Sequence, residues 1–364
     1  MDLARGGGDT AQLGLAFGGN PLLAVIRALS DNQQQVIYLG IVLLGVIAIM
    51  VAANLGETNE TWRTAAYLLM IGAASIVAIL ALLNLGIIVL DPNGAASAAK
   101  NAGVTVARLE GGAFLEFTAA FAAGSALLPA IRRTVGRLVP GFRPDSAINA
   151  IGLSLYLLVL LFYVSIQVSS DQLKQLSQPG PSPSVIFIIG TNQLPFLIVA
   201  LVGVGLFTRR GLRQTLLRLG LYWPGWRWVA GSLGVAVALV IFGTVFDNLM
   251  AHLTPEQSKN IQQASDQLLK NVNSLLPAIA IALAAGIGEE ILFRGALQPR
   301  LGIVAAALLF AVLHAQYAIS LATLEIFILG IFLGLLRRRA GTTAAIIAHS
   351  GYDMILLLIT LFVK

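Results

Sequence analysis

The sequence predicts an all-α membrane protein, a polytopic bundle of about ten transmembrane helices. Hydrophobic residues occupy 57% of its 364 positions and charged residues only 11%, whereas charged residues occupy about a quarter of the positions in soluble globular proteins. The hydrophobic residues are gathered into runs of about 20, the length that crosses ~30 Å of hydrocarbon. These runs lack the alternation of a membrane β-barrel, and lipid offers no hydrogen bonds to bare backbone, so the runs must be helical.

Ten runs are long and apolar enough to be spans, although the eighth and ninth are short and also fit a tilted or partly re-entrant helix. In order, the runs cover residues 36–54, 64–90, 113–131, 147–168, 185–207, 228–246, 275–293, 301–315, 321–336 and 342–363. They predict four parts: a polar or interfacial amino-terminal extension (1–35), a transmembrane module of about six spans (36–250), a polar loop with a surface helix (251–274), and a core of four spans (275–364). The extension lacks a short apolar stretch followed by a cleavage site, so we expect no removable signal peptide.

Basic residues orient the bundle. The chain has 23 Lys and Arg against 17 Asp and Glu, a formal net charge of +6, and the arginines gather after the third, fifth, seventh and ninth runs. These loops fall on one side if ten spans alternate, which predicts that they are cytoplasmic and that both termini face outward. Short clusters between apolar runs do not make the basic face of a nucleic-acid-binding protein, so no nucleic acid is expected. Segment 209–218, with arginines and leucines interleaved, predicts contact with anionic membrane lipid at the inner interface.

Ionisable residues inside the last four runs mark the candidate site. Glu289, Glu290 and Arg294 lie at the end of the seventh run, where an ionised side chain costs about 2.5 to 17 kcal/mol at the bilayer centre and is therefore rare without a function. Residues four apart share a helix face, so Glu290 and Arg294 are predicted to pair. Glu289 is rotated by roughly 100° and is left available as a general base. The chain has no cysteine, which excludes thiol catalysis and Cys-ligated zinc.

Two of the three histidines lie in the eighth and tenth runs. His314 follows Phe310 by one turn, an apolar neighbour that limits water around the imidazole. His349 and Asp353 project from one face of the last run, where Asp353 either orients the imidazole or contacts substrate. Glu289, His314 and His349 together also make a carboxylate and two imidazoles, the ligand set of a catalytic zinc with one open position. From the residues alone, a zinc site and a metal-free site both remain open.

Three motifs resemble the signature motifs of a known family. They read Glu-Glu-Ile-Leu-Phe-Arg at 289–294, Phe-Ala-Val-Leu-His at 310–314 and His-Ser-Gly-Tyr-Asp at 349–353. In their order and separation they look like the motifs of the CAAX protease and bacteriocin-processing (CPBP, or Abi) family of intramembrane endopeptidases, which is related to the CAAX prenyl proteases of the Ras-converting type. The resemblance covers about the last 90 residues and says little about the first six runs.

The resemblance implies an enzyme that hydrolyses a peptide bond of a membrane-associated protein or peptide. The matching residues are Glu289 and His314 for activating water, His349 and Asp353 for stabilising the oxyanion, and Glu290, Arg294 and Phe310 as support. The family is labelled a metalloprotease family, although a metal-free glutamate mechanism has also been proposed, so zinc held by Glu289, His314 and His349 is an open expectation. We prefer the unaided mechanism because His349 already has an oxyanion role with Asp353. We expect an integral, multi-pass protein of the plasma membrane of a prokaryote.

Two alternatives compete with the protease. In a proton-coupled transporter, Glu116, Glu289 and the histidines would line an ion path, but such a protein is expected to show matching halves, and no internal repeat is apparent here. A catalytically idle member of the family would act as a scaffold or in bacteriocin immunity. The protease interpretation makes a geometric prediction: Glu289, His314 and His349 should converge on one polar cavity in the cytoplasmic half of the bilayer.

Overall fold

The computed structural model describes residues 30–180, 182–314 and 317–362. Most of the predicted amino-terminal extension, and the end of the predicted eighth run at residue 315, therefore lie outside the described residues. The chain divides into two compact units, Met1–Gly45 and Val46–Lys364. The described part of the first unit is the beginning of one helix, α2 (Asp31–Leu55), whose remainder belongs to the second unit.

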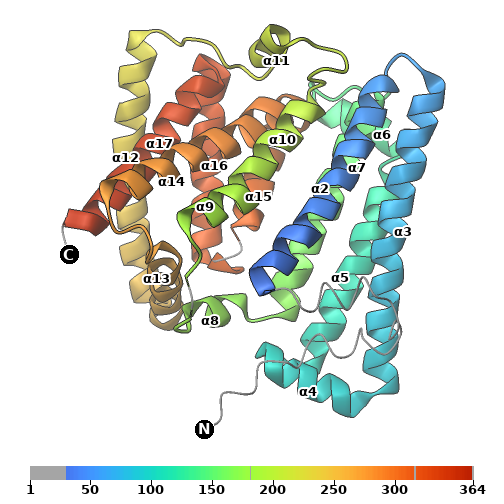
Figure 1. Cartoon of the computed structure of the whole chain (residues 1–364), viewed down its shortest axis with the longest axis horizontal. Coiled ribbons are helices and arrows are strands. Elements are labelled where there is room, and N and C mark those ends of the chain that lie inside the picture. Colours follow the sequence, from blue (N-terminus) through green and yellow to red (C-terminus); the bar gives the residue numbers. More distant parts are fainter. Residues whose placement is uncertain (1–29, 181, 315–316, 363–364) are drawn as a thin grey trace. The chain divides into compact units, whose positions relative to one another are not determined.

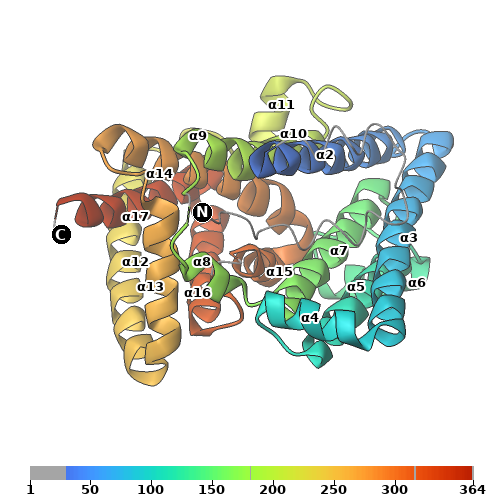
Figure 2. The ribbon, with the colours of Figure 1, turned by 60° about the horizontal axis from the view of Figure 1, so that its bottom comes forward.

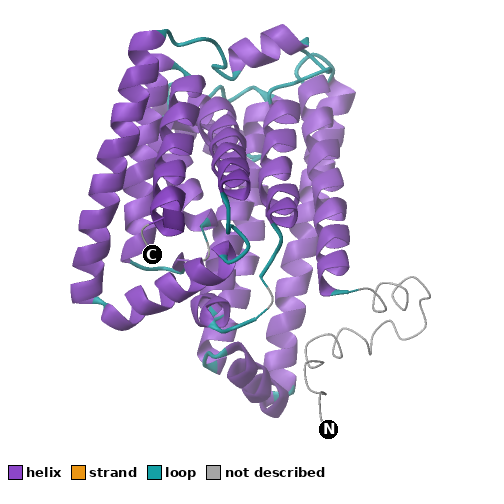
Figure 3. Cartoon of the chain, turned by 60° about the vertical axis from the view of Figure 1, so that its left-hand side comes forward, coloured by secondary structure: helices purple, strands orange, loops and turns teal. Residues whose placement is uncertain are grey.

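The predicted all-α class is confirmed. Within the described ranges helices are the only regular elements apart from an isolated bridge between Leu206 and Arg210, and Figure 3 shows helices joined by loops. After α2 the elements are α3 (Glu60–Leu90), α4 (Pro92–Ala102), α5 (Val106–Ser125), α6 (Pro129–Leu138), α7 (Ala147–Ser169), α8 (Gln172–Ser177), α9 (Val185–Ile188), the π-helix η1 (Ile189–Gln193), α10 (Leu194–Gly203), α11 (Leu212–Arg218), α12 (Trp226–Leu253), α13 (Pro255–Leu269), α14 (Leu275–Glu290), the π-helix η2 (Ile291–Leu297), α15 (Gln298–Leu313), α16 (Leu321–Ala340) and α17 (Thr342–Phe362).

The chain is an integral, multi-pass membrane protein, but the predicted count of ten spans is not confirmed. By length and composition, seven of the described helical segments could cross a membrane, or eight if one bent pair is counted. Helix α16 is not among them, because Glu325 and the arginines at 337–339 add charge to it. The predicted seventh and eighth runs form a single helical segment, Leu275–Leu313, in which the backbone leaves the helical region at Gly302 (φ 86°, ψ 170°).

The predicted third span is wrong at its carboxyl end. Helix α5 stops at Ser125, and α6 begins at Pro129 after a bend of 88°. Proline has no N–H to donate, and it disfavours a helical conformation in the residue before it. Leu128 accordingly has an extended backbone (φ −70°, ψ 133°). The arginines that follow therefore lie on a separate short helix rather than at the end of a span.

Within the second unit, the helices pack side by side in two groups joined through α15. Helices α3, α5 and α7 contact one another in sequence, and α12, α14 and α16 all contact α17 (Figure 1). Helix α15 contacts both α7 and α16 and lies between them in Figure 2. Small residues permit the closest approaches: a Cβ at Gly330 would lie 3.0 Å from the Cβ of Ala307, and one at Gly334 would lie 2.8 Å from Ile303.

Two π-helical segments interrupt the bundle where the candidate residues lie. Segment η1 separates α9 from α10, and η2 follows directly after Glu290. Elements η1 and α14 are in contact, as are α10 and η2. Gly288 permits this approach, since a Cβ there would lie only 2.9 Å from the backbone oxygen of Gln193. Short π-helical turns often occur at functional sites, and here they bring a polar side chain of the amino-terminal part beside the motifs.

Candidate active site

The four predicted catalytic side chains line one cavity. Its volume is about 240 Å³, and Glu289, His314, His349 and Asp353 all border it. They come from α14, from the residue after α15, and from α17, so three separate helical segments build the site. The structure thus brings together residues that lie up to 64 positions apart in the sequence.

Glu289 faces both imidazoles with one oxygen and a glutamine with the other. Its Oε1 accepts a hydrogen bond of 3.0 Å from Nε2 of Gln193. Its Oε2 lies 3.9 Å from Nε2 of His314 and 4.0 Å from Nε2 of His349, and has no direct hydrogen-bond partner among the described side chains. These separations are too long for direct hydrogen bonds but suit a water bridge. One oxygen is therefore held in place and the other points to the histidines.

His314 is oriented by the backbone of its own helix. Its Nδ1 donates to the carbonyl oxygen of Phe310 at 2.7 Å, and because a carbonyl can only accept, the proton must lie on Nδ1. In the neutral ring Nε2 then carries a lone pair, and this is the atom that faces Glu289. The rings of Phe310 and His314 meet edge to face with centroids 4.6 Å apart, which fixes the imidazole plane from one side.

Glu290 holds two partners at once. Its Oε1 lies 2.9 Å from Nη1 of Arg294, the pair expected from their four-residue spacing, and also accepts a hydrogen bond of 2.8 Å from Nδ1 of His349. Arg294 in turn donates to the carbonyl oxygen of Gly330 and lies over the ring of Phe310, 4.2 Å from its centroid. The side chains of Glu290, Arg294, Phe310 and His349 are all buried. Glu290 therefore connects Arg294 of η2 to the imidazole on α17.

Asp353 has a different place from the one expected if it orients the imidazole. Its Oδ2 lies 3.6 Å from Nε2 of His349, while the hydrogen bond that orients the ring is the one from Nδ1 to Glu290. Nδ1 of His349 on α17 faces Glu290 at the end of α14, and Nε2 faces Asp353. Asp353 is left at the open edge of the ring, on the side that faces the cavity.

Sequence reasoning missed Gln193. It lies in η1, within the predicted fifth span, and its contact with Glu289 joins residues 96 positions apart. A signal was present, since Thr191, Asn192 and Gln193 form a polar stretch inside an otherwise apolar run. Polar side chains within a span tend to face other helices or a cavity. The partner of such a residue, however, cannot be read from the chain.

Glu116, which an ion path through the bundle would need, lies elsewhere. It is on α5, where its side chain bonds to Asn84 of α3 and Ser165 of α7. It is not among the described residues that border the cavity of Glu289. Its contacts join three neighbouring helices to one another.

The three predicted zinc ligands lie near one another, but farther apart than the ligands of a bound zinc. In the described parts of the chain, no group of three or more His, Asp or Glu side chains could hold a metal ion. Ligands at 2.0–2.1 Å from a tetrahedral zinc lie about 3.3 Å apart, whereas the two Nε2 atoms lie 3.9 and 4.0 Å from Oε2 of Glu289. These separations leave room for a water molecule that bridges Glu289 to the histidines.

Comparison with known families finds a match that covers the carboxyl-terminal part of the chain. Residues 271–355 match the family model described as type II CAAX prenyl endopeptidase Rce1-like. This segment is similar to the Rce1-like domain. The match confirms the resemblance that the three motifs indicate, and because the family is one of proteases, it supports a hydrolase. Searches of curated proteins and of solved structures found no match.

The Rce1-like domain contains all three motifs but not the whole lining of the site. It spans roughly a quarter of the chain and includes Glu289, His314, His349 and Asp353. Gln193 lies outside it, on an element between α9 and α10. The amino-terminal helices therefore contribute at least one polar side chain that bonds directly to a motif residue, Glu289.

Proposed function

We propose that this protein is an intramembrane endopeptidase that hydrolyses a peptide bond of a membrane-associated protein or peptide, using Glu289 and His314 to activate water. The observation that carries the proposal is the pair of atoms Glu289 Oε2 and His314 Nε2. They lie 3.9 Å apart on the border of one cavity, and each is oriented by a hydrogen bond to its other heteroatom. A water molecule between them can donate one proton to each.

In the first step Glu289 acts as the general base. The water oxygen attacks the carbonyl carbon of the scissile peptide, one proton of the water moves to Oε2 of Glu289, and the electron pair of the C=O bond moves to the carbonyl oxygen. Nε2 of His314 accepts a hydrogen bond from the remaining O–H of the water and so sets the direction of attack. Gln193 is a positioning residue here, because it holds Oε1 and so aims Oε2.

In the second step His349 stabilises the oxyanion and Glu289 returns its proton. With Nδ1 bonded to Glu290, an imidazolium at position 349 presents the proton on Nε2 to the oxyanion, and the buried carboxylate of Glu290 stabilises that positive charge. The tetrahedral intermediate then collapses: the C–N bond breaks and the leaving amine takes the proton from Glu289. Asp353, 3.6 Å from Nε2, limits the rotation of the ring and borders the substrate.

The cavity supports a lipid-modified or membrane-embedded substrate. Apart from its polar residues it is lined by apolar side chains from α12, α14, α16 and α17, among them Leu239, Ile281, Leu329 and Leu357. An apolar wall next to a water-activating pair fits a peptide whose neighbouring part is hydrophobic. We therefore propose a prenylated CAAX-type peptide as the first substrate to test, with the enzyme in the plasma membrane of a prokaryote.

The test is cleavage by the purified full-length protein in proteoliposomes. The substrates are a farnesylated CAAX peptide, the same peptide without the farnesyl group, and a transmembrane peptide. We expect cleavage of at least one membrane-bound substrate and slower cleavage of the peptide that lacks its anchor, because the site lies among spans. Mass spectrometry of the fragments identifies the bond that is cut. Folded protein that cleaves none of the three would contradict the proposal.

Chelation tests the part that zinc plays. We expect cleavage to survive exhaustive treatment with a chelator, because Glu289 and His314 activate water without a shared ion in the arrangement that we propose. If zinc is instead held by Glu289, His314 and His349, the ion would polarise the water and the carbonyl oxygen. Elemental analysis would then find close to one zinc per chain, and activity would be lost on chelation and restored by zinc. That result would overturn the metal-free mechanism but not the peptidase.

A further inference from the structure

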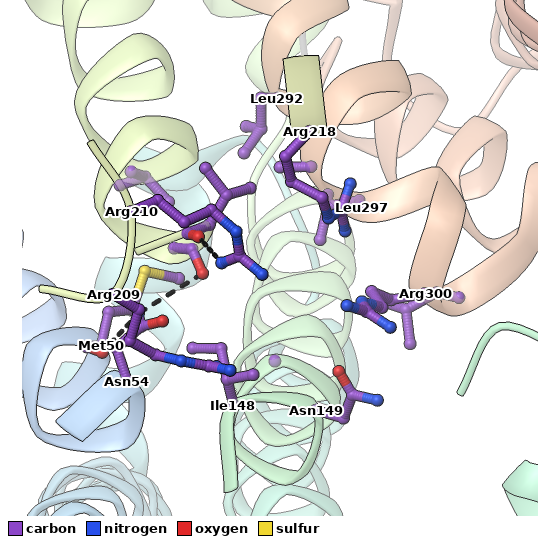
Figure 4. Close-up of a pocket in the computed structure, with 16 residues that line it drawn as sticks. Met50, Asn54, Ile148, Asn149, Arg209, Arg210, Arg218, Leu292, Leu297 and Arg300 are labelled. Atoms are coloured by element: carbon purple, nitrogen blue, oxygen red, sulfur yellow. Dashed lines mark hydrogen bonds between the residues drawn. The ribbon is translucent and has the colours of Figure 1, made fainter. Parts of the chain in front are cut away.

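A second cavity, separate from the active site, is bordered by four arginines. Its volume is about 100 Å³, and none of its lining residues borders the cavity of Glu289. Arg209, Arg210, Arg218 and Arg300 point toward its centre from the α10–α11 loop, α11 and α15 (Figure 4). The remaining wall is mostly apolar and includes Met50, Ile148, Val204, Leu292 and Leu297.

Three of these arginines have no acidic partner within 4.0 Å among the described residues. Arg209 lies 3.5 Å from Glu57, whose Oε1 is already bonded to Ser146 and to the backbone N–H of Ile148. The other three donate only to backbone carbonyls: Arg210 to Val204, Arg218 to Gly295 at 3.3 Å, and Arg300 to Gly141 at 3.4 Å. In the described ranges of the chain, no carboxylate oxygen lies within 4.0 Å of any of the three.

The arginines also repel one another. Burial, together with the positive charges of Arg300, Arg210 and Arg337, lowers the pKa of Arg218 to about 10. All three unpartnered arginines are only half-exposed, so water screens their repulsion incompletely. A bound anion would relieve both the desolvation and the repulsion.

The surroundings place this cavity at the level of a membrane surface. Large apolar side chains are exposed on the segments that carry or follow the arginines: Phe207 is 87% exposed, Trp223 61% and Trp226 76%. The two tryptophans contact each other with ring centroids 4.9 Å apart. Tryptophan is enriched where a membrane meets water, and arginine on the cytoplasmic side of spans. The anion that reaches such a cavity most readily is the phosphate of a lipid.

We propose that this arginine pocket binds the phosphate group of an anionic membrane phospholipid. The planar guanidinium group has a fork of donors that matches phosphate oxygens in pairs, so three unpartnered arginines around one cavity form a strong phosphate site. The apolar wall gives the adjoining acyl chain a surface to lie against. The lipid would join α11, α15 and the end of α10, which meet at this pocket.

The experiment measures lipid binding by the full-length protein in neutral detergent. Phosphatidylglycerol is titrated, with phosphatidylcholine as the zwitterionic comparison, while the melting temperature and the bound lipid in native mass spectrometry are followed. We expect saturable stabilisation and retention of phosphatidylglycerol only. Arg218→Gln and Arg300→Gln should each raise the half-saturating concentration at least about tenfold, the effect of losing one charged hydrogen bond. Arg339→Gln, which removes an exposed arginine that does not line the pocket, should leave it unchanged.

Further arms separate the possible sources of the phosphate. If inorganic phosphate or glycerol 1-phosphate alone stabilises the protein at similar concentrations, the ligand is a soluble phosphate and the lipid assignment is overturned. Equal weakening by Arg339→Gln would reduce the effect to general surface charge and overturn the pocket itself. Equal binding of both lipids would show no preference for an anionic lipid and would also overturn the proposal. If a glutamine variant fails to fold, Arg218→Lys can replace it, because lysine keeps the positive charge but lacks the paired donors of the guanidinium group. We expect intermediate binding from this variant. These readouts do not depend on peptidase activity.

Discussion

Glu289→Gln should lower the rate of peptide cleavage by at least about 100-fold, the lower range of what a positioned general base contributes. Glutamine has nearly the same shape as glutamate and can still bond to Gln193, but it cannot take a proton from the water. The melting temperature should therefore stay close to that of the unmodified protein. The measurements are the cleavage rate in proteoliposomes and thermal unfolding followed by tryptophan fluorescence. A rate equal to that of the unmodified protein would remove Glu289 from the mechanism.

Gln193→Ala provides the matched comparison. It removes the hydrogen bond to Oε1 and leaves the carboxylate itself in place, so the loss should be smaller than for Glu289→Gln. A residue that only positions the base should lower kcat with little change in KM, because it does not contact the substrate. A drop in melting temperature with kcat unchanged would instead make Gln193 a packing residue.

Glu290→Ala should abolish activity and also destabilise the protein by about 3–5 kcal/mol, the usual effect of breaking a buried ion pair by removing one partner. Arg294 is 1% exposed, and without Glu290 its remaining described hydrogen bond is the long one to Gly330. His349 loses the acceptor of its Nδ1 proton at the same time. Thermal unfolding in detergent and the cleavage rate measure the two effects.

The double variant Glu290→Ala with Arg294→Met separates these effects. Removing both charges and filling the space with an apolar side chain should restore part of the stability, because no unpaired buried charge is left. Activity should stay absent, since His349 still lacks its acceptor. A melting temperature of Glu290→Ala equal to that of the unmodified protein would show that the buried pair does not support the fold.

Much of the architecture was predictable because the membrane restricts the choices. Lipid demands that every span satisfy its own backbone hydrogen bonds, so apolar runs such as 147–168 and 342–363 predict helices almost to the residue. The ion pair of Glu290 and Arg294 was equally accessible, since residues four apart meet on any helix. The bend at Pro129 could also have been found, because proline and the residue before it leave helical geometry for local steric reasons.

The contacts that join different helices were not predictable in the same way. Glu290 bonds to His349 across α14 and α17, a relation of 59 positions, and α-helical spacing suggested Asp353 for that role instead. Gln193 reaches Glu289 only because Gly288 lets η1 approach α14. The arginines of the second cavity come from loops and helices that the sequence separates by up to 91 positions.

The sequence by itself determined that this protein lies in a membrane, that its elements are helices, and which residues form the three motifs. Hydropathy and short-range spacing act within a single helix, so they can be read from the chain. The tertiary structure decided which atoms of those motifs face one another: Oε2 of Glu289 toward His314, and Nδ1 of His349 toward Glu290. It also brought four arginines from outside the motifs to one pocket. Such choices depend on how helices rotate and approach. That depends in turn on small residues, bends and π-turns whose effects accumulate over the whole bundle, so no local pattern in the chain encodes them.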